Sequence, residues 1–392
     1  MAKLLEWKYR KSHIINPSSG AGTDYQIRII VHYGSGTDNG EHVYLNGKCK
    51  EDFGDIRFTK SDGVTLLPYW MEEKVDGDYA IFWVKITEDL STNPVMIYIY
   101  YGNPDAVYDG NPEEVFIFFD HFDGDVIDTN KWEGEISGFS IGNSILSTNQ
   151  DHVDLIAKNL NLENCCIEAK WRVNENSYGI CLGIRIGTVY DPHPDGYYGA
   201  LRPMSPANRV QIRKYSAGSG TVIVGRDTMN YTPSTWTRAY IKAYGNTLRF
   251  KASDVDDEIS VTDTQFTQGS ISLATFANDY GNGICEWDWV AVRKYVEPEP
   301  SHGDWGSEEI VFVFKISGYC YDYNGNPVPN ATVWLFRTSD KAFIAETTSN
   351  EDGYYEFIVE EDTEYFLRAH KDGTPNIFGT TDRNIRPEKI YF

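Results

Sequence analysis

The chain has 392 residues, with 58 acidic side chains against 35 basic ones and a formal net charge of −23. Electrostatic repulsion makes nucleic acid and anionic membranes unfavourable partners for such a surface. At roughly 150 residues per domain, this length predicts two or three domains. No apolar run approaches the roughly 20 residues of a membrane span, and the first ten residues lack the apolar core of a signal peptide. We therefore expect no membrane span and no signal peptide in this chain.

Aromatic and turn-forming residues dominate the composition, with 27 Tyr, 19 Phe and 10 Trp, and with Gly, Asn, Asp and Thr recurring at close intervals. This composition favours an all-β fold. The six cysteines, at 49, 165, 166, 181, 285 and 320, form no Cys-x-x-Cys pair and lack the spacing of zinc ligands. We expect most of them to be free, buried residues, although one or two disulfides in the middle region remain an alternative.

The first region, residues 1–105, contains segments in which apolar and polar residues alternate, as they do in half-buried strands. These segments are 26–33, 80–86 and 95–101, and Gly- and Asp-rich turns separate them. The pattern predicts an antiparallel β-sandwich rather than a βαβ unit.

Several motifs of this region resemble a family described as a domain of unknown function, DUF2341. The motifs are Trp7–Lys11, Asp55–Phe58, Asp62–Trp70, Trp83–Ile86 and Ile99–Asn103. The family occurs in large modular surface proteins of bacteria, archaea and their viruses, and it has no agreed activity. The resemblance therefore implies a biological setting but no chemistry.

One of these motifs predicts a structural ion pair. In the segment Asp55–Phe58, strand alternation places Asp55 and Arg57 on one face and Ile56 and Phe58 on the other. A half-buried arginine needs an anionic partner. We expect Arg57 to pair with a carboxylate and to act as a clamp rather than as a ligand-binding group.

A turn-rich, acidic linker at 103–114 leads into the second region, whose opening segment runs from Phe119 to Trp132. This segment resembles the start of concanavalin-like jelly rolls of the laminin-G or glucanase type. Further strand-like segments follow in an order that fits the same fold: 166–173, 180–186, 209–215, 237–244, 248–252, 269–276 and 285–293. The resemblance implies a jelly roll over residues 115–297, a fold used mainly to hold sugars or to display surfaces.

A second linker, 296–303, is rich in Pro and Glu and is expected to be semi-extended. The last region, 311–392, contains Ile316–Asp322, Asn324–Leu335, Thr347–Phe357 and Glu364–Ala369. These segments resemble the carboxypeptidase regulatory-like (transthyretin-like) family, whose Ig-like sandwiches serve mostly as spacers and interface modules. The whole chain is thus predicted to be all-β, with three tandem antiparallel β-sandwich domains.

Catalytic motifs are scarce. Retaining glucanases use two carboxylates about 5 to 5.5 Å apart, and the nearest approximation is Glu286-Trp287-Asp288. This pair lies on the apparent closing strand, and no third acid follows at Val290. Phosphate loops and His-x-x-x-His pairs are also missing from the sequence. We predict that the protein is not an enzyme, with a polysaccharide-degrading glycoside hydrolase as the alternative.

Two loops of the second region carry the residues expected at a sugar site, which needs flat aromatic faces and planar hydrogen-bonding groups. Alternation requires at least one of Tyr197 and Tyr198 to point inward, so a purely structural role remains open. His193, in the same loop, is expected to be solvated. The candidate glycan-binding residues are Tyr190, Asp195, Tyr197, Tyr198, Arg202, Asp279, Tyr280 and Asn282.

Calcium is the one cofactor that the sequence indicates, because jelly rolls offer several carboxylate oxygens to this cation. The candidate ligands are Asp120, on the opening strand, and Asp288, on the closing strand. The segment Asp322–Asn326 also alternates oxygen donors, but it lacks the rest of an EF-type loop and is predicted to be a plain turn.

These features predict a non-catalytic structural or adhesion protein of a virion, a tail appendage or an extracellular filament. Its central jelly roll would bind a glycan on a host surface or pack against other structural subunits. A homo-oligomer and a location outside the cell or on a virion surface are expected. A purely structural spacer that self-associates and binds no ligand is the second alternative.

Overall fold

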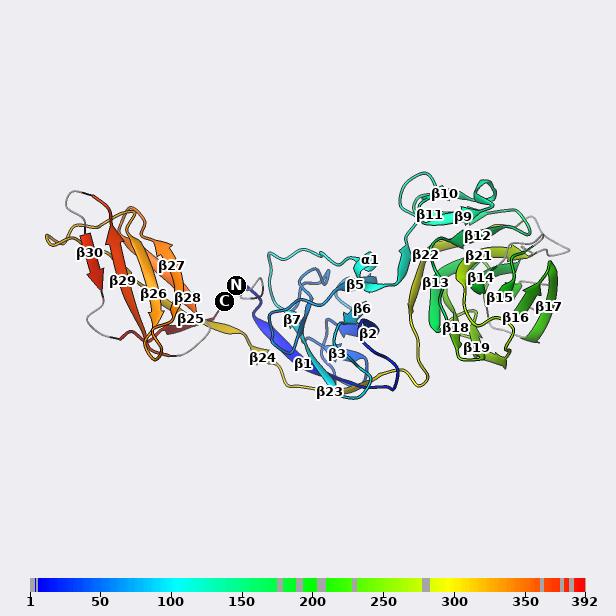
Figure 1. The fold of residues 1–392 in the computed structure, drawn as a ribbon, viewed down its shortest axis with the longest axis horizontal. Coiled ribbons are helices and arrows are strands. Elements are labelled where there is room, and N and C mark those ends of the chain that lie inside the picture. Colours follow the sequence, from blue (N-terminus) through cyan, green and yellow to red (C-terminus); the bar gives the residue numbers. More distant parts are fainter. Residues whose placement is uncertain are drawn as a thin grey trace.

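The computed structural model describes residues 4, 6–174, 179–187, 193–202, 209–227, 231–276, 283–359, 363–373, 377–380 and 384–391. Three β-sandwiches form a row in which the first domain lies in the middle, the jelly roll on one side and the C-terminal domain on the other (Figure 1). The strands are almost all antiparallel, with β2 and β3 as a parallel pair. The predicted all-β fold class is confirmed.

The first domain packs a sheet of order β23-β1-β7-β4, to which β24 is added on β1, against a sheet of order β3-β2-β6-β5. Along β1 and β2, buried residues alternate with half-buried ones, and the sequence pattern predicted this alternation for the segment that forms β2. Its strands are β1 (Tyr9–Asn16), β2 (Tyr25–His32), β3 (His42–Tyr44), β4 (Arg57–Lys60), β5 (Tyr69–Val75), β6 (Tyr79–Ile86), β7 (Val95–Tyr101), β23 (Ser301–Trp305) and β24 (Glu309–Ile310).

The prediction of a semi-extended linker at 296–303 is wrong in part, because β23 begins within this range and β24 follows shortly after it. Residues after Pro300 return to the first domain and pair with β1, whose outer edge would otherwise expose unpaired backbone groups. His13 on β1 stacks on Trp305 with ring centroids 3.7 Å apart, and its Nε2 lies 2.8 Å from Nδ1 of His302. The linker composition did not reveal this pairing because the partner strand is almost 300 residues away in the sequence.

The middle domain consists of an eight-stranded and a seven-stranded sheet. Trp132, Trp171 and Trp287 are fully buried between them. The first sheet contains β8 (Phe118–Asp120), β10 (Ser140–Gly142), β11 (Ile145–Thr148), β13 (Cys165–Val173), β18 (Thr237–Tyr244), β19 (Thr247–Lys251), β20 (Ile259–Thr262) and β22 (Cys285–Lys294). The second contains β9 (Trp132–Gly134), β12 (Asp154–Ala157), β14 (Gly179–Ile186), β15 (Gly196–Arg202), β16 (Arg209–Ser216), β17 (Ser219–Arg226) and β21 (Ser270–Phe276).

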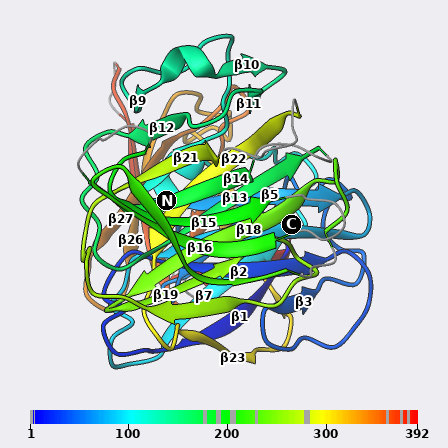
Figure 2. The same cartoon turned by 90° about the vertical axis from the view of Figure 1, so that its right-hand side faces the viewer.

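The eight-stranded sheet faces the first domain, and the seven-stranded sheet faces away from it (Figures 1 and 2). Two short helical turns, α1 (Pro112–Val115) and η1 (Ile136–Gly138), lie beside the sheets. Trp70 of the first domain packs against Phe119 and Trp289 of the jelly roll, with ring centroids 4.9 and 5.4 Å apart. The motif that opens the jelly roll therefore also builds the contact between the two domains.

Buried charges reinforce this contact. Glu168 on β13 accepts hydrogen bonds from Arg293 and Arg238, each at 2.7 Å, and Arg238 also pairs with Glu72 of the first domain at 2.9 Å. Burial alone would raise the pKa of Glu168, but the two guanidinium groups hold it at about 2. The first domain and the jelly roll are thus joined by both an aromatic cluster and an ion network.

The C-terminal domain packs a sheet of order β28-β25-β31 against a sheet of order β27-β26-β29-β30. This is the sandwich architecture expected for the last region. Seven buried residues form its core within the described part of the domain, among them Val333 and Leu367. The strands are β25 (Phe312–Tyr319), β26 (Thr332–Arg337), β27 (Phe343–Thr348), β28 (Tyr354–Val359), β29 (Tyr365–Lys371), β30 (Ile377–Thr380) and β31 (Glu388–Tyr391).

All six cysteines are free, and five of them are buried, with Cys320 as the half-buried exception. This confirms the expectation of free cysteines and leaves no disulfide in the structure. Arg57 forms the predicted clamp, since its Nε lies 3.1 Å from Oδ1 of Asp109 while the guanidinium also donates to three backbone carbonyls. Among the described residues, no helix has the length and hydrophobicity of a membrane span.

Candidate functional site

Four of the eight candidate glycan-binding residues fall outside the described part of the chain: Tyr190, Asp279, Tyr280 and Asn282. The other four lie on β15 or directly before it. Asp195 accepts a hydrogen bond from the Ala217 backbone at 2.6 Å, and half-buried Arg202 packs its side-chain carbons beside Gly179. Both residues hold local backbone in place.

The prediction that Tyr197 and Tyr198 bind a glycan is wrong, because both rings are fully buried and leave no face for a sugar. Tyr197 points between the two sheets, where its hydroxyl donates to Asp263 at 2.5 Å. Tyr198 points to the opposite face and packs against Tyr215 and Phe276. Alternation correctly predicted one inward ring, but it could not show that the outer face of the sheet is also covered.

The outer face of the seven-stranded sheet holds a buried polar pair. His193 is fully buried and its Nδ1 lies 2.5 Å from Oδ2 of Asp154, so the prediction that it is solvated is wrong. The other Asp154 oxygen accepts a hydrogen bond from Ser272 at 3.1 Å. The rings of Tyr215 and Phe276 enclose the imidazole edge-on. Asp154 is the only carboxylate on strands β12, β14, β15, β16 and β21.

The candidate calcium ligands already have protein partners. One Asp120 oxygen accepts the Phe122 backbone N–H at 2.8 Å and the other accepts the Trp132 indole N–H at 2.5 Å. Asp288 pairs with Lys170 at 3.3 Å. The described residues contain no group of three or more side chains arranged to hold a metal ion. These contacts make Asp120 an anchor of the opening strand, and calcium ligation by Asp120 and Asp288 stays a prediction.

The suspected catalytic pair has a similar explanation. Glu286 uses both oxygens to bind the guanidinium of Arg172, and Asp288 is held by Lys170 on the neighbouring strand β13. A bulge in the pairing of β13 and β22 places Trp287 opposite Trp171 at this point. Both carboxylates therefore serve as cross-strand ion pairs.

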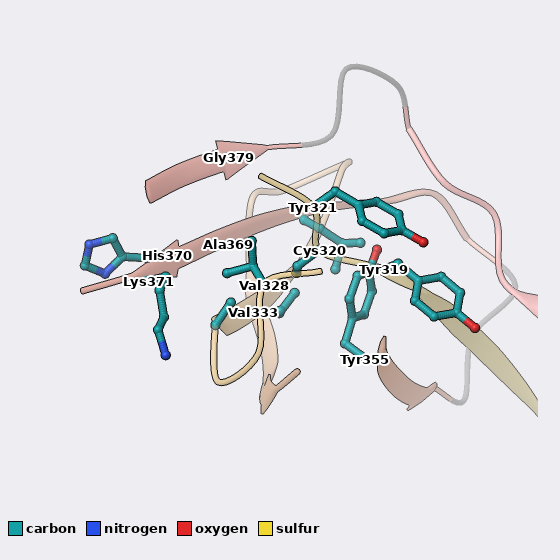
Figure 3. A pocket seen from close by; sticks show the side chains of 12 residues that line it. Tyr319, Cys320, Tyr321, Val328, Val333, Tyr355, Ala369, His370, Lys371 and Gly379 are labelled. Atoms are coloured by element: carbon teal, nitrogen blue, oxygen red, sulfur yellow. The ribbon is translucent and has the colours of Figure 1, made fainter. Parts of the chain in front are cut away.

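A pocket that the sequence analysis missed lies in the C-terminal domain (Figure 3), and we call it the tyrosine pocket. It has a volume of about 230 Å³. Its walls are apolar, with Val328, Val333 and Ala369 in the middle, three tyrosines on one side, and His370 and Lys371 on the other. The tyrosines are Tyr319, Tyr321 and Tyr355.

Two of these tyrosines form an exposed platform beside the pocket. Tyr319 and Tyr321 are 54% and 56% exposed, and their rings stack with centroids 5.9 Å apart and an angle of 19° between the planes. A glycine precedes them for a steric reason, since a Cβ at Gly318 would lie 2.5 Å from the hydroxyl of Tyr355. Exposed flat rings beside an apolar cavity with polar groups at its rim are typical of a small-ligand site.

The turn that follows the platform is rigid. The Asp322 carboxylate accepts hydrogen bonds from the Asn326 side-chain amide at 3.0 Å and from the Asn326 and Asn324 backbones at 2.8 and 2.9 Å, and these bonds lower its pKa. The plain turn predicted for this segment is confirmed. The available sequence signal for the pocket was the Tyr-x-Tyr alternation of Tyr319 and Tyr321. It was overlooked because this segment was considered only as a possible metal site.

Comparison with protein families gives one match, to the domain of unknown function DUF2341, over residues 52–135. The matched range crosses from the first domain into the jelly roll and includes Trp70 and Phe119 of the interdomain contact. An uncharacterised protein of Methanocaldococcus jannaschii, MJ1472, is 32% identical over 90 residues, which are 21% of this chain and 16% of that protein. The chain thus covers about one sixth of this relative.

Similar solved structures include the carbohydrate-binding module CBM66 from Bacillus subtilis, at 14% identity over 47% of this chain and 94% of that one, with a TM-score of 0.27. A β-1,3-1,4-glucanase from a mouse hindgut metagenome has 14% identity over 45% and 99% of the two chains, with a TM-score of 0.35. The carbohydrate recognition domain of Emp47p has 12% identity over 45% and 94%, with a TM-score of 0.34. At these scores the likeness carries no functional argument.

Proposed function

We propose that this chain is a non-catalytic structural or adhesion protein of a virion, a tail appendage or an extracellular filament, and that it binds glycans through the tyrosine pocket. The observation that carries the proposal is the exposed pair of stacked tyrosines, Tyr319 and Tyr321, beside a cavity of about 230 Å³. This moves the proposed binding from the central jelly roll to the C-terminal domain.

The chemistry of the pocket suits a pyranose. The apolar C–H face of the sugar can stack on an exposed tyrosine ring, and its hydroxyls can bond to the polar rim. On the far side of the pocket, Lys371 donates to the Asn330 carbonyl at a long 3.3 Å. The phenol oxygens of Tyr319 and Tyr321 add exposed donors and acceptors. A single sugar residue or the end of a chain is the ligand that this cavity accommodates.

The rest of the molecule supports a structural role. The aromatic cluster, the ion network and the returning strand β23 join the first domain and the jelly roll into one unit. The C-terminal domain lies at the opposite end of the row from the jelly roll (Figure 1). Such an arrangement suits a protein that holds a binding domain away from the structure that carries it.

The proposal that the protein is not an enzyme is supported by its carboxylates. Glu286 and Asp288 are each ion-paired, and Asp154 is bonded to His193 and Ser272. A retaining glycosidase needs two carboxylates facing one cleft. Reducing-end assays with β-glucans, agars and cell-wall extracts should therefore give no product, and product formation that is lost in Glu286→Gln would support the hydrolase alternative.

Glycan binding is tested on an array with the full chain and the double variant Tyr319→Ala/Tyr321→Ala. We expect the wild type to bind a defined set of glycans and the double variant to lose them. Phe343→Ala is a matched control, because Phe343 is also 56% exposed on the same domain and does not line the pocket. Array silence of the wild type would favour the purely structural spacer.

A further inference from the structure

A second cavity lies between the first domain and the jelly roll, and we call it the junction cleft. Its volume is about 400 Å³. One wall comes from β2 and β6, with Arg28 and Trp83, and the opposite wall from β18 and β19, with Tyr240 and Lys251. Ligand sites often form at such domain boundaries because both walls are preformed.

The cleft is rich in charged side chains, several of which are paired: Arg28 with Glu41, Arg238 with Glu72 and Lys242 with Glu258. The chain carries a net charge of −23, yet cationic side chains outnumber carboxylates in the lining. The five cations are Arg28, Arg238, Lys242, Lys251 and Arg293, and the three carboxylates are Glu168, Asp254 and Glu299. Because most of these charges are paired, an anionic ligand would depend on the cations that keep unused donors.

Two of the five cations, Lys251 and Arg28, have hydrogen-bond donors that no protein group accepts in the described part of the chain. Arg293 and Arg238 are committed to Glu168, as described above. Lys251, in contrast, has no hydrogen-bond or ion-pair partner among the described residues. Arg28 uses one terminal nitrogen for Glu41, at 3.1 and 3.2 Å, while its Nε is buried without an acceptor. Lys251 lies on β19 and Arg28 on β2, so the two side chains line opposite walls of the cleft.

We propose that the junction cleft binds a small polyhydroxylated ligand that carries a carboxylate, that is, an acidic saccharide. Its carboxylate would meet Lys251 and Arg28, since charge-assisted hydrogen bonds are the strong ones. Its hydroxyls would meet the oxygens of Asp254 and Tyr240. The cleft is separate from the tyrosine pocket, and this proposal does not rest on the function proposed above.

The test is a ligand-observed NMR titration of the full chain with D-glucuronate, D-glucose and inorganic phosphate. We expect glucuronate to bind, with an affinity that falls as salt is added, and glucose and phosphate to bind at least roughly tenfold more weakly. Lys251→Gln should weaken glucuronate binding by roughly tenfold or more. Arg28→Gln, on the opposite wall, should give a loss of similar size.

Lys158→Gln is the matched control, because it makes the same change of charge on the same domain outside the cleft. It should leave binding unchanged, and so should Tyr319→Ala. Lys251→Gln should keep the melting temperature of the wild type, since it removes no contact. Absence of glucuronate binding, equal binding of glucose, equal binding of phosphate, or equal losses in Lys251→Gln and Lys158→Gln would each overturn the proposal.

Discussion

The junction between the first two domains and the C-terminal domain are built in opposite ways. At the junction, large aromatic residues are hidden, with Trp70 and Trp289 only 5% and 2% exposed. In the C-terminal domain, Tyr319 and Tyr321 are more than half exposed, and Tyr323 is fully exposed at a turn. The comparison shows that aromatic content alone does not locate a binding surface, because many aromatic residues are buried in domain cores and in the contact between domains.

The largest expected effect comes from Trp70→Ala. It removes a buried indole from the aromatic cluster and should lower the free energy of unfolding by about 3 to 5 kcal/mol. Calorimetry should show the joint transition of the first domain and the jelly roll moving to lower temperature. In the matched control Trp334→Ala, on the C-terminal domain, that transition should keep its position. Equal shifts in both variants would contradict a special role of the junction.

Glu168→Gln tests the ion network at the same junction. It removes the carboxylate that Arg238 and Arg293 share and leaves them only Glu72 and Glu299 as anionic partners, which should cost about 3 kcal/mol of unfolding free energy. Glu286→Gln breaks the less buried pair with Arg172 and should cost about 1 kcal/mol or less. Urea denaturation of both variants measures the difference. A smaller loss for Glu168→Gln than for Glu286→Gln would mean that the network adds nothing to the contact.

Acidification should weaken the returning strand. Burial and the neighbouring His302 lower the pKa of His13 from 6.5 to about 3. The unfolded chain therefore binds a proton below pH 6.5 that the folded chain does not, so stability present above that pH is lost on acidification. From pH 7 to pH 5 this residue should account for about 2 kcal/mol.

Stability against pH should thus become flatter in His13→Phe. The control His121→Phe, which removes a half-buried histidine from a loop of the jelly roll, should keep the slope of the wild type. Identical slopes in all three proteins between pH 7 and pH 5 would rule out His13 as the source.

The smallest effect is expected for metal removal. Asp120 and Asp288 are satisfied by protein donors, so treatment with EDTA should leave the melting temperature unchanged. Addition of millimolar calcium should also have no effect. A rise in melting temperature with calcium that disappears in Asp120→Asn would support the calcium prediction.

Local sequence patterns predicted the parts of the fold that depend on neighbouring residues. The segment from Phe119 to Trp132 predicted where the jelly roll begins. The alternation of side chains along a strand correctly predicted that one of Tyr197 and Tyr198 points inward. The pairing of residues 301–310 with β1 was missed because it depends on an edge that forms only in the folded first domain. The burial of His193 was missed for the same reason, since its partner Asp154 is distant in the sequence.

The candidate site was predicted less well than the fold. Tyrosines on β15 and tyrosines at the end of β25 look alike in a sequence, and only packing separates a buried ring from an exposed one. Tyr198 is enclosed by Tyr215 and Phe276, whereas Tyr319 stacks on Tyr321 and keeps more than half of its surface in solvent.

The most direct test is a calorimetric titration of the strongest glycan from the array into the wild type and three variants. We predict that Tyr319→Ala and Tyr321→Ala each weaken binding by roughly 1 kcal/mol or more, as loss of a stacking ring should, and that Phe343→Ala binds as the wild type does. Unchanged affinity in both tyrosine variants would contradict the assignment of glycan binding to the C-terminal domain.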